Sequence, residues 1–93
     1  MSAATLEYGM YKNLTATGNV TTCPFGVLIG FYVNSTTGGT LVLRDGGSSG
    51  TVMGGTITPA IGFHRFPAKF VNGLHATIAN TLDVTFFYVD GQQ

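Results

Sequence analysis

The residues that favour β-strands occur in this chain as short runs separated by glycine-rich or polar segments, and this spacing limits the possible folds more than any other feature. β-Branched and aromatic residues fill the runs, and no long stretch shows the spacing of apolar positions typical of an amphipathic helix. Short strands with frequent turn signals predict an all-β fold, a single antiparallel β-sandwich or compact jelly-roll-like domain. The expected strands cover residues 25–34, 40–45, 51–58, 63–66, 74–79 and 83–89, with a further candidate at 5–12.

A chain of 93 residues can build one hydrophobic core but not two. We therefore expect residues 25–93 to form the sandwich domain. Residues 1–24 are polar and rich in threonine towards their end, and they are expected to form an N-terminal arm or an edge segment.

Strict alternation along the strongest run, residues 25–34, sets the expected faces of that strand. It places Val27, Ile29, Phe31 and Val33 on one face, with Leu28, Gly30 and Tyr32 on the other. Both faces are then largely apolar, as are those of residues 83–89. Turns or chain ends are expected where glycine, proline and asparagine gather: residues 35–39, 45–50, 72–73 and 80–82, with Pro67 ending the strand at 63–66.

Charge is scarce, and its scarcity excludes two classes of partner. Charged residues make up 9% of the chain against roughly 25% in an average domain, and the net charge is zero. Four scattered cations do not form a nucleic-acid footprint or a polybasic membrane anchor. The longest apolar run is also too short for a transmembrane helix, which needs about 20 residues. A small uncharged domain with a mean hydropathy of +0.30 favours burial of its surface against copies of itself or a large partner.

No arrangement of residues predicts an enzyme or a bound cofactor. His64, His75 and the single Cys23 lack the spacing of a structural zinc site, and Cys23 is expected to be a small buried thiol. The serines lie in turn segments without a nucleophile-elbow pattern. The glycine-rich segment 46–55 lacks the Gly-Lys-Ser/Thr ending of a phosphate-binding loop. We therefore expect no metal, no cofactor and no catalytic residue.

The segment Phe63–Phe70 interleaves aromatic and basic residues and is the strongest candidate for a binding surface. Aromatic residues and arginine are enriched at interfaces. The alternative is an edge strand with its aromatic residues in the core and its cations in water. Exposed tyrosines would also suit the stacking of a sugar ring. The candidate interface residues are Phe63, His64, Arg65, Phe66, Lys69 and Phe70, together with Tyr8 and Tyr11.

The order of motifs from residue 25 to residue 90 resembles that of small structural proteins of tailed bacteriophages. The shared elements are a G-T-L-x-L-x-D segment, a strand ended by proline, an F-P-x-x-F-x-x-G-L turn and a closing D-V-T-x-x-Y strand. In this chain they correspond to residues 39–45, 56–59, 66–74 and 83–88. These are mostly residues that determine the fold.

The resemblance implies a non-enzymatic virion protein. The implied role is decoration of the head, as a cement protein that binds the major capsid protein on the outer capsid surface and stabilises the shell. Homotrimers are common among such proteins, and a homotrimer is therefore expected here. Residues 1–24 lie outside the resemblance and are expected to form an arm that contacts the capsid. The alternative is a head-fibre or tail-associated module that binds carbohydrate or a host surface.

Overall fold

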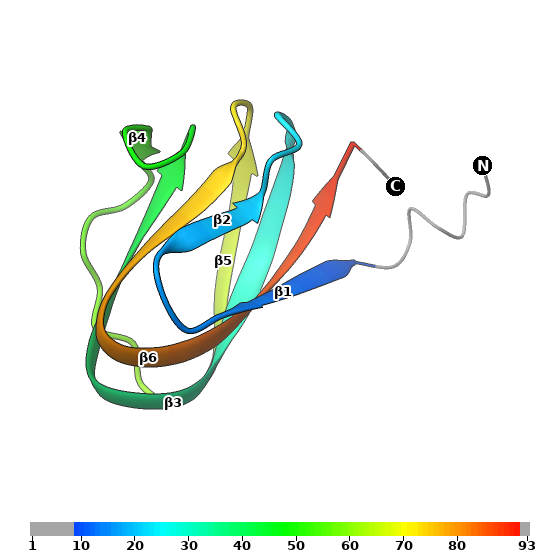
Figure 1. Ribbon diagram of the computed structural model, residues 1–93. Helices are drawn as coiled ribbons and strands as arrows, with labels where there is room; N and C mark the ends of the chain where they lie inside the picture. Colours follow the sequence, from blue (N-terminus) through cyan, green and yellow to red (C-terminus); the bar gives the residue numbers. More distant parts are fainter. Residues whose placement is uncertain (1–8, 92–93) are drawn as a thin grey trace.

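The computed structural model describes residues 9–91, which fold as one antiparallel β-sheet of six strands (Figure 1). No helix occurs within this range. The predicted all-β, antiparallel, sandwich-like class is confirmed. The strands are β1 (Met10–Leu14), β2 (Gly18–Thr21), β3 (Gly26–Asp45), β4 (Thr51–Val52), β5 (Gly62–Phe70) and β6 (Leu74–Asp90).

Two long strands, β3 and β6, form the frame of the molecule. They pair with each other from Gly26↔Asp90 at one end to Asp45↔Leu74 at the other. The four shorter strands attach to the two free edges of this ribbon: β1 and β2 pair with β6, and β4 and β5 pair with β3.

The ribbon bends near its middle, and the bend folds one sheet into two layers (Figure 1). The turns predicted at residues 35–39 and 80–82 are wrong as chain reversals, because both segments continue as strand. Gly38 and Asn80 adopt left-handed backbone angles, with φ of 64° and 61°. The Asn80 side-chain amide donates to the Gly38 carbonyl oxygen at 2.9 Å. The same residue types that signal a turn therefore bend two paired strands together.

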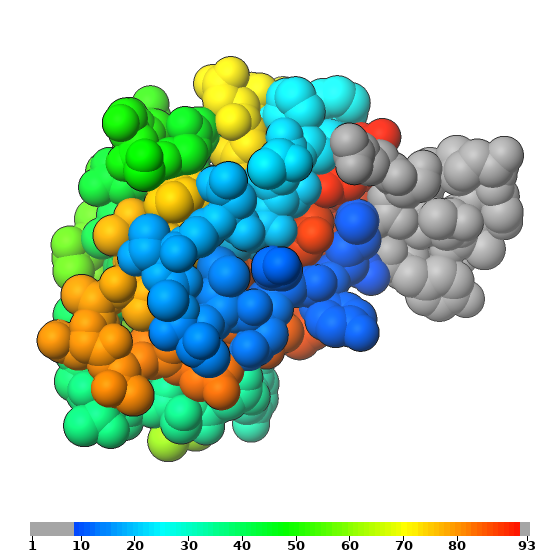
Figure 2. Space-filling view, in the orientation of Figure 1, coloured from blue at the N-terminus to red at the C-terminus, as the bar shows by residue number. Residues whose placement is uncertain are grey.

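Layer one consists of β1, the C-terminal half of β6, the N-terminal half of β3 and β5. Layer two consists of β2, the N-terminal half of β6, the C-terminal half of β3 and β4. In Figure 2 the residues of β1 and β2 form a continuous blue band across one side of the molecule. This band closes one side of the space between the layers, because β1 and β2 also contact each other.

The core lies between the two layers. Phe31, Phe86 and Phe70 are its largest fully buried side chains, and the Phe31 ring centroid is 5.9 Å from that of Phe86. Alternation along residues 82–90 of β6 buries every second residue, as the sequence predicts for residues 83–89. The remaining buried apolar residues of this cluster are Val20, Leu28, Val33, Leu41, Leu43, Leu74, Ala76, Leu82, Val84 and Tyr88.

A β-bulge in β3 changes which residues face the core. Leu28 pairs with Tyr88 but Gly30 pairs with Phe87, so Ile29 is an extra residue on β3. Leu28 is fully buried, whereas Ile29 is 38% exposed. The predicted faces are therefore wrong for residues 27–29, because strict alternation does not continue through the bulge.

Strand β5 is longer than predicted, and the strand predicted at residues 51–58 is shorter. Pro67 does not end β5, because it lies in the irregular stretch of this edge strand between Arg65 and Ala68 and interrupts no regular pairing. In the other segment, only Thr51–Val52 and a bridge between Ile57 and Leu41 pair with β3. Gly55, with φ of 90°, separates these two contacts.

The turn at Asn72–Gly73 is present, but it joins the two layers and does not close a hairpin. β5 pairs with β3 and not with β6, so the chain crosses from layer one to layer two at this corner. Asp45 fixes the corner, because its carboxylate accepts hydrogen bonds from the backbone N–H groups of Val71 and Asn72. The predicted loop at residues 45–50 is also present, with positive φ at Gly46 and Gly47.

The described part of the N-terminal segment, residues 9–24, contributes two edge strands. β1 pairs with residues 84–88 and β2 with residues 74–76. Both strands lie at edges of the sheet. The strand predicted at residues 5–12 begins at Met10, and the rest of that prediction lies outside the described residues.

Candidate interaction surface

The candidate segment Phe63–Phe70 lies on β5, where alternation divides its residues between two faces. Phe63, Arg65 and Lys69 are exposed on the side away from the core. His64 and Phe66 point to the inner side, with ring centroids 5.3 Å and 6.3 Å from that of Phe31. The residues of this segment are thus divided between an exposed and an inner face, and the binding surface stays a prediction for the exposed one.

Phe70 is fully buried and therefore drops out of the candidate surface. Phe66 is partly buried against the core, and His64 is half-buried with Nε2 2.7 Å from the carbonyl oxygen of Ala60. Tyr11 lies on β1 and is 74% exposed. Tyr8 lies outside the described residues.

The surface that remains is the side of layer one that faces away from the core, which we call the outer face. Strand pairing aligns its residues in three rows across the strands. The first row is Lys69–Val27–Val89, the second Arg65–Gly30–Phe87–Tyr11, and the third Phe63–Tyr32–Thr85–Asn13.

The outer face carries much more apolar surface than a strand face in contact with water usually does. Tyr11, Val27, Tyr32 and Phe63 are between 42% and 74% exposed. From the usual area of an aromatic side chain, the two tyrosines and Phe63 alone expose on the order of 300 Å². A patch of this size equals the largest apolar patch on a typical monomer, and such patches are often functional.

Gly30 lets two aromatic rings meet at the centre of the outer face. A Cβ atom on Gly30 would lie 2.8 Å from Cζ of Phe63 and 2.5 Å from the carbonyl oxygen of His64. The Phe63 ring therefore occupies the space above this glycine, with its centroid 6.3 Å from that of Phe87. Without a side chain in the row, the centre of the face becomes a continuous aromatic surface.

A polar group limits the aromatic surface at the end next to the bend. The amides of Asn13 and Asn34 both donate to Asp83 Oδ1, at 2.7 Å and 3.2 Å, and both donate to Thr85 Oγ1 at 3.1 Å. These hydrogen bonds hold β1 and β3 to β6 on the outer face. The apolar part of the face thus has a defined polar border.

Sequence reasoning identified Tyr11, Phe63, Arg65 and Lys69 but missed Val27 and Phe87 as members of one surface. The signal was present in the apolar character of both faces of residues 25–34 and 83–89. A strand that is apolar on both faces either has both faces buried within the protein or has one face available for a partner. Only the pairing register shows that these residues lie next to those of β5.

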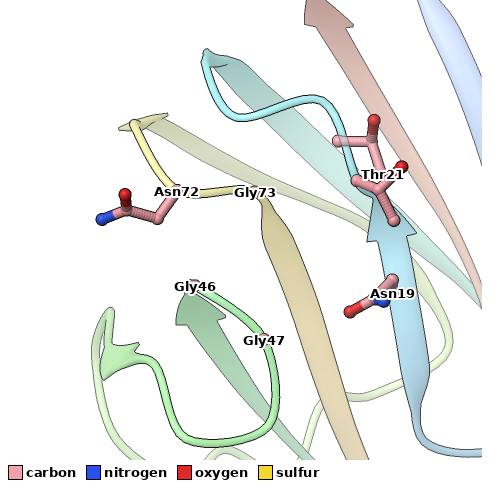
Figure 3. A pocket seen from close by; sticks show the side chains of 7 residues that line it. Asn19, Thr21, Gly46, Gly47, Asn72 and Gly73 are labelled. Carbon is pink, nitrogen blue, oxygen red and sulfur yellow. The ribbon is translucent and has the colours of Figure 1, made fainter.

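A second feature is a small open pocket of about 170 Å³ at the end of layer two (Figure 3). β2 contributes Asn19 and Thr21, the loop after β3 contributes Gly46 and Gly47, and the corner before β6 contributes Asn72 and Gly73 (Figure 3). Its lining is neutral, and it contains no aromatic ring on which a ligand could stack.

His75 contacts this pocket through Asn19. It is 5% exposed, and its Nδ1 lies 2.9 Å from Oδ1 of Asn19, so the tautomer with a proton on Nδ1 donates that hydrogen bond. Nε2 is buried and has no hydrogen-bond partner among the described residues. Burial and, second, the nearby charge of Arg44 lower the pKa of His75 below its usual 6.5.

We expect the stability of the folded chain to fall on mild acidification because of His75. Above pH 6.5 both states hold the imidazole neutral and the full stability is present. As the pH falls through 6.5 towards the lower folded pKa, the unfolded chain takes up a proton that the folded chain resists, and stability is lost. Thermal melts between pH 8 and pH 5 check this. His75→Gln should flatten the dependence, and an unchanged slope in that variant would refute the assignment.

Within residues 9–91, no group of three or more His, Cys, Asp or Glu side chains is arranged to hold a metal ion. Cys23 is buried, with Sγ 3.6 Å from the carbonyl oxygen of Phe25. The described range also contains no helix of the length and hydropathy required to cross a bilayer.

Fold and surface together define a small all-β domain: one bent antiparallel sheet in two layers, with an exposed aromatic face on layer one. A scan against protein-family models, a search of curated proteins and a search of solved structures each return no match to the chain.

Proposed function

We propose that this chain is a structural protein of a tailed-phage virion that acts as a capsid decoration protein, without enzymatic activity. The observation that carries the proposal is the outer face, an aromatic surface with basic residues along one margin on a chain of zero net charge. The sequence motifs resemble those of small phage structural proteins, and this resemblance indicates a virion as the assembly. In this role the protein is a homotrimer that binds the major capsid protein on the outside of the shell.

Three of the four motifs of the resemblance occupy structural positions in the fold, whereas residues 56–59 form only an isolated bridge at Ile57 and no strand. The segment Gly39–Asp45 follows the bend of β3 at Gly38 and ends with the Asp45 side chain that fixes the corner. The Phe66–Leu74 motif forms the end of β5 and that same corner. The closing motif, Asp83–Tyr88, is the part of β6 in layer one. These three motifs therefore lie in the paired strands and at the corner that connects the two layers, and the closing motif contributes Phe87 to the outer face.

A cement protein stabilises a shell by binding the assembled state more tightly than its separated parts. Such binding needs complementary surface and no reacting group. An apolar face with a polar border meets this requirement, because desolvation of the aromatic centre supplies affinity while the border gives register.

The test is cosedimentation of the purified protein with expanded shells assembled from the major capsid protein encoded in the same genome. We expect saturable binding and a higher temperature for shell disruption. Arg65→Glu and Phe63→Ser should reduce binding while their far-UV spectra stay unchanged. Val52→Ser, on β4 of layer two, replaces a similarly exposed apolar residue (43%) and is the matched control. Failure of the wild-type protein to bind these shells refutes the decoration role.

The second candidate is a carbohydrate-binding or host-adhesion module on a head fibre or tail. The exposed rings of Tyr32, Phe63 and Tyr11 favour it, because sugar rings stack on such surfaces. This hypothesis predicts binding on a glycan array or to host cells that is lost in Tyr32→Ala and Phe63→Ala. Shell binding without glycan binding selects decoration, and the reverse result selects adhesion.

A further inference from the structure

One row of the outer face ends in a cation on one margin and in an aromatic ring on the other. Strand pairing places Arg65, Gly30, Phe87 and Tyr11 side by side, from β5 through β3 and β6 to β1. Arg65 is exposed on the β5 margin, and Tyr11 is 74% exposed on the β1 margin. Both residues thus lie on the edge strands of the described part of the sheet.

These two groups cannot meet within one chain. Three strand spacings separate them, or about 14 Å at 4.8 Å per spacing. A guanidinium group and a tyrosine ring nevertheless attract each other when the cation lies over the ring face within about 6 Å, which changes an affinity by about two- to thirtyfold depending on desolvation. Each margin therefore has a complementary partner on the opposite margin of another copy.

The charges favour a head-to-tail contact between the two margins. A contact that paired β5 margins would oppose Arg65 to Arg65 and Lys69 to Lys69, and like charges repel. The β1 margin carries no cation on the outer face that would repel Arg65 or Lys69. Its Lys12 pairs in register with the buried Phe86 and so points to the other side of the sheet. Head-to-tail contacts generate a closed ring when the rotation between copies closes on itself, and an open filament when it does not.

We propose that neighbouring copies of this chain contact each other margin to margin, with the Arg65 guanidinium of one copy stacked on the Tyr11 ring of the next. The contact keeps the ends of the same row level with each other. Tyr32, Phe87 and the Phe63 ring above Gly30 lie between the margins, so this aromatic centre of the outer face stays available to the capsid protein. The number of copies in the ring, three, rests on the proposed function. The contact itself is inferred from the row that joins Arg65 to Tyr11.

The native mass and its concentration dependence test the contact, measured by light scattering behind size exclusion. The wild-type chain should give three times 9.7 kDa, about 29 kDa. Tyr11→Phe keeps the ring and should keep that mass. Tyr11→Leu keeps apolar area but loses the ring, and Arg65→Gln loses the cation. Each of these two substitutions should raise the protein concentration at which the ring dissociates into single chains about tenfold or more. The double variant should be little weaker than either single one.

Three results would overturn the contact: a wild-type mass of 9.7 kDa at every concentration, unchanged association in both Tyr11→Leu and Arg65→Gln, or additive losses in the double variant. Val52→Ser again serves as the matched control, and thermal melts confirm that the variants are folded. Shell cosedimentation is a separate readout. A ring that forms but binds no shell refutes decoration and leaves the contact standing, whereas shell binding by a monomer refutes the contact alone.

Discussion

Gly39→Ala is expected to lower the free energy of unfolding by about 2–3 kcal/mol, because the bend of β3 has no room for a methyl group at this position. A Cβ atom there would lie 2.5 Å from the carbonyl oxygen of Thr81 and 2.7 Å from Cβ of Leu82. Neither neighbour can move away easily, since both belong to the paired strand β6. Urea denaturation followed by circular dichroism measures the change.

The adjacent glycine provides the matched control. Gly38 has a positive φ of 64°, but a Cβ atom there would meet nothing within 4 Å. Asparagine tolerates this backbone conformation, so Gly38→Asn should change the free energy of unfolding by less than about 1 kcal/mol. If the two variants were equally stable, close approach of β3 and β6 at Gly39 would not be what limits the bend.

Leu28→Ala is expected to cost about 2–5 kcal/mol, whereas Ile29→Ala should cost less than about 1 kcal/mol. Leu28 is fully buried in the core, and Ile29 is 38% exposed on the opposite side of the strand. The two substitutions remove similar amounts of apolar side chain from adjacent residues. The difference between their free energies of unfolding therefore tests whether the bulge places Leu28, and not Ile29, in the core. Urea denaturation of both variants under the same conditions measures it.

The opposite order of effects would show that β3 follows strict alternation, with Ile29 in the core. That result would also move Val27 off the outer face and remove the first of its three rows. The native mass of Ile29→Ala should stay that of the wild-type chain, because this residue lies outside the row that joins Arg65 to Tyr11. The stability and association effects of these variants are thus separable.

The outer face shows how a chain with few charges combines a buried core with an exposed aromatic surface. Because residues alternate between the two sides of β6, Phe86 packs in the core and the adjacent Phe87 lies on the outer face. The same division occurs in β5, between Phe63 and Phe66. Substitutions on the outer face should therefore change association far more than they change folding.

The sequence by itself determined the class of fold and most of the residues that form strands. β-Branched and aromatic runs restrict the backbone to extended conformations, and they do so through local sterics that need no tertiary context. The loop at residues 45–50 and the corner at Asn72–Gly73 follow in the same way, because glycine supplies the positive φ angles that these positions require. The burial of alternate residues in β6 was likewise predictable from a period of two.

Tertiary structure alone decided the register, and with it the composition of the surface. Gly38 and Asn80 look like turn residues, yet they bend β3 and β6 without reversing them, because each strand is already paired with the other at the bend. Ile29 looks like a core residue until the pairing with β6 forces a bulge. Arg65 and Tyr11 are far apart in sequence and share a row only through two intervening strands. Pairing is a long-range interaction, and a shift of one residue exchanges the two faces of a strand, so local preferences cannot fix it.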